Sequence, residues 1–345
     1  MEATITNPQD LDILSTPSSD ASSALKSFLS DLEDYLGERV SLLERDLESL
    51  ARDSLTTGGK RIRPALVFAC GGDNPEIRPN LVKAAAIVEF VHVATLVHDD
   101  VLDDATIRRG RRSLYASHGA TAAILLGDAL FAHALEMASE FPDTEVCRLV
   151  AKATRRTCSG EIRQSFLRGD FTLNLAEYRS IVEAKTAELF QVSCVLGASL
   201  SGREQGLCRL LGEFGRGLGL SYQIYDDLAD AFGNEENMGK TLGRDLSHGK
   251  VTLPLITLFS KLPESQSQQL LAEFLDYGSE PSSELISRTC SLLEEHAVYD
   301  HCRAYLENEL RLLERILGEL KDSSLVMRLD YMRLVILDKL KDLRC

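Results

Sequence analysis

Two short acidic motifs, far apart in the chain, place the strongest constraint on its fold. The run His98-Asp99-Asp100-Val101-Leu102-Asp103-Asp104 ends the mostly apolar segment 84–97, and Asp226-Asp227-Leu228-Ala229-Asp230 follows a second largely apolar segment. If segment 84–97 is a helix, Asp99 and Asp103 stand one turn apart on one face, with Asp100 beside them. Clustered carboxylates repel each other and also oppose the negative end of the helix dipole. Positive charge must therefore compensate them.

Two sources of positive charge fit this pattern. Arginines follow the first motif directly, at Arg108, Arg109, Arg111 and Arg112, and a hard divalent cation would accept such oxygen ligands. A solvated acidic helix end is the ordinary interpretation of a single charge run. Because Asp-Asp-x-x-Asp occurs twice in this chain, we instead predict two walls of one metal site.

The spacing of apolar residues predicts helices along almost the whole chain. Leu25, Leu29, Leu32 and Leu36 form one apolar stripe, and helices are expected over 81–99, 125–138 and 151–166. The tail 303–343 is expected to form two amphipathic helices divided near 322–324. Neither an alternating strand pattern nor a low-complexity linker is found. The sequence therefore predicts an all-α protein, with a disordered leader at 1–24 and one large helical domain at 25–345.

Composition narrows the choice of ligand and compartment. The net charge of −15 argues against nucleic acid as a partner, so the basic group at Lys60, Arg61 and Arg63 favours a small anionic ligand. No apolar run was expected to span a bilayer. The first 24 residues lack Lys and Arg, unlike a typical signal or transit sequence. The eight cysteines show no metal-ligand spacing, and the chain is expected to be cytoplasmic with reduced thiols.

Other candidate residues are open to more than one interpretation. The run Gly58-Gly59-Lys60-Arg61-Ile62-Arg63-Pro64 could aim Lys60 and Arg63 at phosphate oxygens, or form only a solvated turn before a helix. His92 lies two turns before Asp99 on roughly the same face, where a core role and a ligand role are equally plausible. Lys185 and Thr186 lie within a largely apolar segment, and a lone Lys there usually extends to water.

Small side chains precede the first motif. Thr95, Ala94 and Val91 occupy the helix face leading back from Asp99, and no aromatic residue stands there close to the carboxylates. Plain core packing would explain these residues. If the helix instead lines a cavity, that cavity is open and apolar beneath the acidic cluster.

Taken in order, the motifs resemble those of the trans-isoprenyl diphosphate synthases, and in particular the long-chain polyprenyl diphosphate synthases. The resemblance extends from Gly58 to Ile256. One Asp-Asp-x-x-Asp is weak support, whereas the ordered set is specific. Its segments are Gly-Gly-Lys-Arg-Ile-Arg-Pro, the first aspartate motif with its Arg-Arg-Gly, Gly127-Asp128, Lys185-Thr186, Tyr222 to Asp227, Gly239-Lys240, and Asp245 to Pro254.

This resemblance implies an all-α fold around a deep central cavity, usually in a homodimer. Mg²⁺ would be bound by Asp99, Asp103 and Asp226, while Asp100, Asp227 and Asp230 would bind it too or contact its ligands. Isopentenyl diphosphate would be held by Lys60, Arg63, His92 and Arg109. The allylic diphosphate would be held by Arg108, Lys185, Lys240 and Lys250. Thr186 and Gln223 would lie near its reacting carbon, and Lys185 and Lys240 would take part in catalysis.

Product length follows from the same comparison. In the family, bulky aromatics just before the first aspartate motif stop chain growth early. Ala94 and Thr95, with Val91 below them, predict a product longer than geranylgeranyl (C20). Release of such a product is compatible with a transient contact between the enzyme and a membrane. Phe131 or Leu135 could still form a floor, which would make a farnesyl or geranylgeranyl synthase the alternative.

Two further alternatives are a class I terpene cyclase and a non-catalytic partner subunit. A cyclase has no use for the second diphosphate set of Lys60, Arg63 and Arg109. A non-catalytic subunit would tolerate broken aspartate motifs, yet both motifs are complete. The exact product, the preferred starter and the pathway are not specified by the sequence.

Overall fold

The computed structural model describes residues 19–56, 59–108, 110–233, 243–277 and 281–343. The predicted all-α class is confirmed. The first helix begins at Ser19, before the predicted Leu25, and residues 1–18 of the expected leader lie outside the described residues. The helices are α1 (Ser19–Val40), α2 (Arg45–Thr56), α3 (Ile62–Gly71), α4 (Arg78–Leu102), α5 (Leu114–Ser139), α6 (Glu145–Phe166), α7 (Leu175–Val182), the π-helix η1 (Glu183–Ala187), α8 (Glu188–Leu200), α9 (Gln205–Phe232), α11 (Arg244–Ser247), α12 (Leu253–Lys261), α13 (Glu264–Tyr277), α14 (Ser283–Glu295), α15 (Val298–Gly318) and α16 (Ser323–Asp342).

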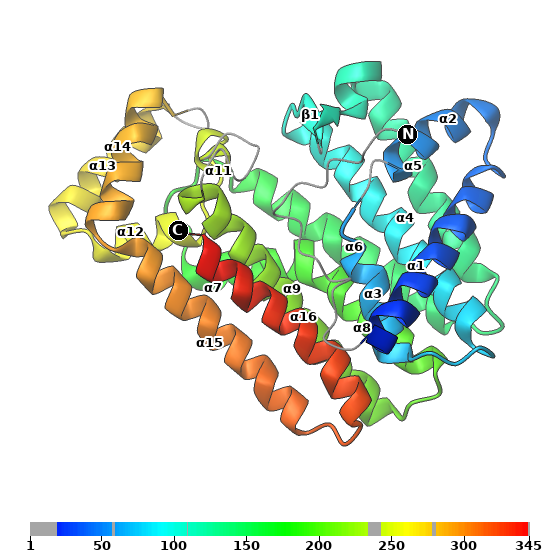
Figure 1. The fold of residues 1–345 in the computed structure, drawn as a ribbon. Helices are drawn as coiled ribbons and strands as arrows, with labels where there is room; N and C mark the ends of the chain where they lie inside the picture. Colours follow the sequence, from blue (N-terminus) through cyan, green and yellow to red (C-terminus); the bar gives the residue numbers. More distant parts are fainter. Residues whose placement is uncertain (1–18, 57–58, 109, 234–242, 278–280, 344–345) are drawn as a thin grey trace.

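Long helices pack side by side around α4, α8 and α9 (Figure 1). Helix α4 packs most extensively against α5, and α8 packs against both α9 and α3. The C-terminal pair α15 and α16 follows one flank, with α15 against α9, while α12 to α14 gather at one end. The two C-terminal helices predicted from the tail are therefore confirmed, and their division at Asp322 is a side-chain cap on the backbone N–H of Ser324 and Leu325.

Helix α4 is apolar on nearly all sides, which is typical of a core helix. Its buried residues extend from Leu81 to Val97. The helix ends at Leu102, where the backbone N–H of Asp103 donates to the carbonyl of Asp99 over 2.9 Å. The first aspartate motif therefore lies at the C-terminal end of a long core helix, as the sequence predicts.

Helices α4 and α5 are both long and apolar enough to cross a membrane by length and composition alone. The expectation that no apolar run reaches that length is therefore wrong. In α4, 72% of the apolar window is buried inside the fold, whereas in α5 only 39% is buried. Core packing accounts for α4 but leaves much of α5 uncovered.

Exposed apolar side chains are concentrated on α5 and its neighbour α6. Leu125 is 59% exposed and Phe166 is 83% exposed, and Ile124, Leu135 and Ile162 are exposed as well. Large exposed apolar residues on adjacent helices are typical of an interaction surface. We call these five residues the α5–α6 apolar face.

A π-helix interrupts the segment that the sequence predicts as an ordinary helix. The segment begins at α7 with a capping box, in which Asn174 and Glu177 satisfy each other's backbone N–H groups. Directly after α7, the π-helix η1 widens the turn at Glu183–Ala187, and α8 then continues the helix. Single π turns inside helices occur frequently at functional sites.

Two glycines allow neighbouring helices to approach η1 closely. A Cβ atom at Gly160 of α6 would lie 2.5 Å from the backbone nitrogen of Lys185, and one at Gly219 of α9 would lie 2.7 Å from the Cα of Ala187. Contacts this short would force the backbone to move. The π-helix therefore lies between α6 and α9, and the glycines on these two helices allow both of them to approach it closely.

One small departure from the all-helical prediction follows the first motif. The two-residue strands β1 (Ile107–Arg108) and β2 (Arg111–Arg112) pair antiparallel. The turn before them contains Asp104 in the left-handed conformation, with φ of 46°. The strands bring the chain back toward α4, where Arg108 meets the motif.

Candidate active site

Asp99, at the end of α4, faces the π-helix. Its carboxylate lies 3.7 Å from Lys185 Nζ, and only 18% of its side chain is exposed. Lys185 Nζ also donates to Gln164 Oε1 over 2.8 Å and pairs closely with Glu161, both on α6. The lysine therefore does not extend to water; it bridges the first motif and α6.

The surroundings of Asp99 disfavour its ionised form. Burial raises its pKa to about 6, with Lys185 acting in the opposite direction and Glu161 and Asp103 raising it further. A hard divalent cation, which prefers oxygen ligands, would stabilise the ionised carboxylate. The chemistry of the donors therefore suits a metal of the predicted kind.

Asp103, one turn along, is held by two cations that lie far away in the sequence. Lys250 Nζ donates to Oδ2 over 2.7 Å, and Arg168 Nη2 donates to Oδ1 over 2.7 Å. Burial alone would raise the pKa of Asp103, but Lys250 and Arg168 outweigh it, so the net shift is downward. Lys250, predicted to hold a diphosphate, here contacts a carboxylate that was predicted to bind the metal.

Asp100 is turned away from Asp99 and is almost fully buried. Arg108 Nε donates to its Oδ1 over 2.9 Å, and its exposed fraction is 4%. The arginine predicted to hold the allylic diphosphate is thus engaged with the motif. Arg109, predicted to hold isopentenyl diphosphate, lies outside the described residues.

The second motif has a different set of partners. On α9, Asp227 accepts a hydrogen bond from the Tyr178 hydroxyl over 2.6 Å and from Gln223 Nε2 over 2.8 Å. Burial raises the pKa of Asp227 well above its usual range, as does nearby Asp245, while the two hydrogen bonds lower it. Both carboxylate oxygens already have protein donors, so Asp227 supports its neighbours in this arrangement.

The other two aspartates of the second motif occupy different environments. Asp230 is buried and accepts from the backbone N–H of Asp245 over 3.0 Å, which ties the end of α9 to α11. Asp226 is half-buried on α9 at the head of the motif. Lys240, predicted to contact the allylic diphosphate, lies outside the described residues.

Consecutive residues of η1 connect the two motifs. Lys185 reaches Asp99 of the first motif, and the Thr186 hydroxyl donates to Gln223 Oε1 over 2.8 Å, with Gln223 bound to Asp227 of the second. The structure therefore brings both aspartate motifs and the predicted pair Lys185 and Thr186 to one place.

Lys60 and Arg63, at the start of α3, lie beside a pair of aromatic rings. Lys60 Nζ is 5.8 Å from the centroid of the Tyr222 ring, and Arg63 Cζ is 4.8 Å from that of Phe190. The two rings are 5.6 Å apart. The predicted cationic pair thus shares one aromatic platform next to α9.

Arg61, between these two cations, has a structural role. Its backbone is left-handed with φ of 44°, and its buried guanidinium pairs with Glu33 over 2.7 Å and with Glu89. A third contact joins it to the carbonyl of Leu55 over 2.9 Å. The buried arginine fixes α1, α2 and α4 around the loop that presents Lys60 and Arg63.

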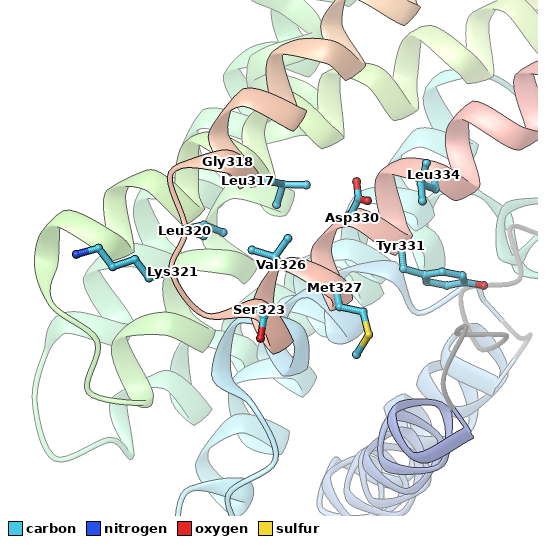
Figure 2. A pocket seen from close by; sticks show the side chains of 10 residues that line it. All are labelled: Leu317, Gly318, Leu320, Lys321, Ser323, Val326, Met327, Asp330, Tyr331 and Leu334. Carbon is cyan, nitrogen blue, oxygen red and sulfur yellow. The ribbon is translucent and has the colours of Figure 1, made fainter.

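One pocket, with a volume of about 410 Å³, lies away from these residues. Figure 2 shows it between the end of α15 and the first turns of α16, with Leu317, Met327 and Tyr331 in its wall. A smaller one touches Gln164, Tyr178 and Lys250. Because the charged side chains that could bind a metal and a diphosphate lie at the two motifs, we place the candidate active site there. Among the described residues, no three His, Cys, Asp or Glu side chains converge closely enough to hold a metal.

Comparison with known proteins identifies the family. Residues 44–289 match the model of the polyprenyl synthetases. The chain belongs to the polyprenyl synthetase family. The resemblance inferred from the motifs is thereby confirmed, together with the assignment as a prenyltransferase.

Several characterised polyprenyl synthetases resemble this chain. The heptaprenyl diphosphate synthase component 2 of Bacillus subtilis is 34% identical over 82% of this chain and 84% of its own length. The octaprenyl diphosphate synthase of Haemophilus influenzae is 32% identical over 71% and 73%. A short-chain isoprenyl diphosphate synthase of Methanothermobacter thermautotrophicus is 30% identical over 83% and 89%.

A solved structure supports both the fold and the use of a divalent metal in the family. The polyprenyl synthase of Caulobacter crescentus, in complex with calcium and isoprenyl diphosphate, has a TM-score of 0.83 and 28% identity to this chain. The superposition covers 94% of this chain and 97% of that one. The predicted isoprenoid synthase fold is thereby confirmed.

Only one of the three predicted chain-length residues of this polyprenyl synthetase has accessible surface of any size. Ala94 is fully buried and Val91 is 1% exposed, whereas Thr95 is half-buried, like His92 and Asp99 on the same side of α4. Thr95 donates its hydroxyl to the carbonyl of His92 over 2.7 Å. Of the three residues, Thr95 is therefore the one with surface left for a further contact.

Four polar residues of the site escaped sequence reasoning. Glu161 and Gln164 bind Lys185, Arg168 binds Asp103, and Tyr178 binds Asp227. Asp245 belongs to a motif found in the sequence, but the contact of its backbone with Asp230 was not predicted. A spacing of three between Glu161 and Gln164, on an otherwise amphipathic helix, was the only local signal. The other partners come from distant segments, and no pattern within one segment announces them.

Proposed function

We propose that this polyprenyl synthetase condenses isopentenyl diphosphate with an allylic diphosphate, in sequential trans additions, to a polyprenyl diphosphate longer than C20. The observation that carries the proposal is the meeting of both aspartate motifs at Lys185 and Thr186 of η1. A site with carboxylates on two walls and cations between them suits a substrate that carries diphosphate.

The chemistry requires charge stabilisation rather than a protein acid and base. Breaking the allylic C–O bond releases diphosphate and leaves an allylic carbocation. The double bond of isopentenyl diphosphate then forms the new C–C bond, and the proton lost from the adduct passes to the released diphosphate. Lys185 and Arg108 would stabilise the leaving group, and the oxygens of Thr186 and Gln223 would face the cation.

Mg²⁺ is the proposed metal, bound by Asp99, Asp103 and Asp226. When bound, it supplies positive charge for the departing diphosphate. Since Lys185 now pairs with Asp99, and Lys250 and Arg168 pair with Asp103, these cations would be released to bind diphosphate oxygens as the site fills. Lys60, Arg63 and His92 would hold isopentenyl diphosphate beside Tyr222 and Phe190, and Lys240 and Arg109 complete the predicted sets.

An assay with farnesyl and labelled isopentenyl diphosphates tests this function. We expect labelled product beyond C20, sized by chromatography, with no incorporation when the metal is chelated. Release of a cyclic hydrocarbon without isopentenyl incorporation would identify a terpene cyclase instead. No release of diphosphate from the pair of substrates would identify a non-catalytic subunit.

Product length has its own test at Thr95. Thr95→Phe should shorten the main product to C20 or below, because the aromatic ring would stand one turn beneath Asp99. Thr95→Val is the matched control, since it keeps the size and should keep the length. Farnesyl or geranylgeranyl diphosphate as the only wild-type product would refute the long-chain proposal.

We further propose that two copies associate through the α5–α6 apolar face in the cytoplasm. Its five exposed apolar residues would be costly in water and are typical of a dimer interface. Leu125→Glu with Phe166→Glu should then yield monomers by sedimentation, whereas charge reversal at the exposed Arg311 of α15 should not.

A further inference from the structure

Tyr178 belongs to a buried chain of hydrogen bonds that ends at the reacting centre. Tyr178 is 3% exposed, and its hydroxyl donates to Asp227 Oδ2 over 2.6 Å. Asp227 Oδ1 accepts from Gln223 Nε2 over 2.8 Å, and Gln223 Oε1 accepts from the Thr186 hydroxyl over 2.8 Å. Three elements, α7, α9 and η1, are joined by these four side chains.

Every donor in this chain points toward Asp227, where the hydrogen bonds converge. Asp227 Oδ1 accepts from the Gln223 amide nitrogen, and a flipped amide would instead set two oxygens against each other. The amide oxygen therefore faces Thr186, whose hydroxyl hydrogen is used for that contact. The lone pairs of Thr186 Oγ1 consequently face away from the chain of bonds, which suits a cationic neighbour.

We infer that Tyr178 is a positioning residue for prenyl transfer, acting through Asp227 and Gln223 to orient the Thr186 hydroxyl. The inference rests on the proposed function, in which Thr186 and Gln223 lie near the reacting carbon. It also assigns Asp227 to orientation of Gln223 rather than to metal binding. Small errors in the orientation of a catalytic group cost large factors in rate.

A purely structural role for Tyr178 makes a different prediction. Burial alone already stabilises the ring among core residues. If packing were its whole contribution, loss of the hydroxyl would lower stability and leave the turnover of folded enzyme unchanged. The kinetic constants of folded variants therefore separate the two roles.

The first experiment compares Tyr178→Phe with Tyr299→Phe. Tyr299, on α15, is an equally buried tyrosine whose hydroxyl donates to the carbonyl of Leu340 on α16 over 3.1 Å. We expect kcat of Tyr178→Phe to fall about tenfold with both KM values nearly unchanged, and kcat of Tyr299→Phe to stay at the wild-type value. A Tyr178→Phe enzyme with wild-type kcat would overturn the inference.

A double-mutant cycle tests whether Tyr178 acts through Gln223. In the Gln223→Leu background, Tyr178→Phe should change kcat by less than about twofold, because the group it positions is gone. Multiplication of the two single effects would contradict the inference. Should Tyr178→Phe fail to fold, Asp227→Asn carries the test: the Mg²⁺ concentration for half-maximal rate should stay unchanged while kcat falls, and a tenfold rise in that concentration would make Asp227 a metal ligand.

These outcomes are distinguishable from failure of the proposed function. Wild-type enzyme that does not incorporate isopentenyl diphosphate would refute the proposed function. Active wild type, an impaired Gln223→Leu variant and an unimpaired Tyr178→Phe variant would refute only the positioning role.

Discussion

The two aspartate motifs share one sequence pattern but have opposite kinds of partner. In the first, Asp99, Asp100 and Asp103 face the cations Lys185, Arg108, Arg168 and Lys250. In the second, Asp227 and Asp230 face neutral donors: a tyrosine hydroxyl, a glutamine amide and a backbone N–H. Among the described contacts, the carboxylates of the first motif are thus paired with cations, whereas Asp227 and Asp230 of the second are hydrogen-bonded to neutral donors.

This difference indicates that the two motifs have different roles. Ion pairs can be exchanged when a metal and diphosphates arrive, because each cation has a new anion to bind. Buried neutral hydrogen bonds have no such replacement, and breaking one leaves an unsatisfied group that costs about 1–3 kcal/mol. The first wall is suited to change partners during the reaction, and the second is suited to hold a fixed geometry.

The largest predicted effect tests the exchangeable wall. Asp99→Ala should reduce kcat by about 10²–10³-fold, because it removes a carboxylate that binds the metal. Incorporation of labelled isopentenyl diphosphate measures the loss. Asp104→Asn, in the same acidic run but exposed and bound to Tyr115, is the control and should stay near wild type. Near-normal turnover of Asp99→Ala would refute the site.

The next prediction disturbs the connection between the two walls. Gly160→Ala should lower kcat by about tenfold or more, since its methyl group would push the backbone at Lys185 and displace both Lys185 and Thr186. Gly37→Ala is the control, because a Cβ there meets nothing within 4 Å in helix α1. Equal turnover in the two variants would mean that the π-helix is not held by that contact.

A third prediction concerns pH. Since burial raises the pKa of Asp99 to about 6, protons compete with the metal below that pH. The Mg²⁺ concentration for half-maximal rate should rise as pH falls from 7 to 5, by about tenfold per unit below 6. Titrations of rate against Mg²⁺ at each pH measure this. A requirement independent of pH would contradict the assignment of Asp99.

The smallest predicted effect is on stability and has opposite signs within the first wall. The raised pKa of Asp99 means that its ionised form costs stability, a cost that grows as pH rises toward 6 and persists above it. The lowered pKa of Asp103 means that its ionised form stabilises the fold, an effect lost as pH falls below about 4.

Metal-free variants at pH 7 check this pair. Asp99→Asn should be more stable than wild type by about 1–2 kcal/mol, and Asp103→Asn should be less stable by a similar amount, measured by denaturant unfolding. Destabilisation by both substitutions would show that Asp99 is already well paired without metal.

Sequence reasoning captured what repeats locally and missed what depends on distant packing. The end of α4 at the first motif follows from a long apolar run with acidic residues after it. Lys185 and Thr186 were found as a pair, but not the π turn that presents both, because no local pattern encodes it. The partners of Asp103 come from the turn after α6 and from the segment before α12, which only the folded chain brings together. The expected pairing of Arg108 with the first motif was found, on Asp100.

The π-helix has one more consequence, for the history of the chain. A π turn is equivalent to one residue inserted into an α-helix, and each residue of an α-helix advances the rotation by about 100°. Deleting one residue from Glu183–Ala187 would yield a continuous helix from α7 to α8 and turn Lys185 and Thr186 away from one of their two walls. A more regular ancestor without the insertion could have had a similar outline, yet it could not have linked the two motifs through neighbouring residues.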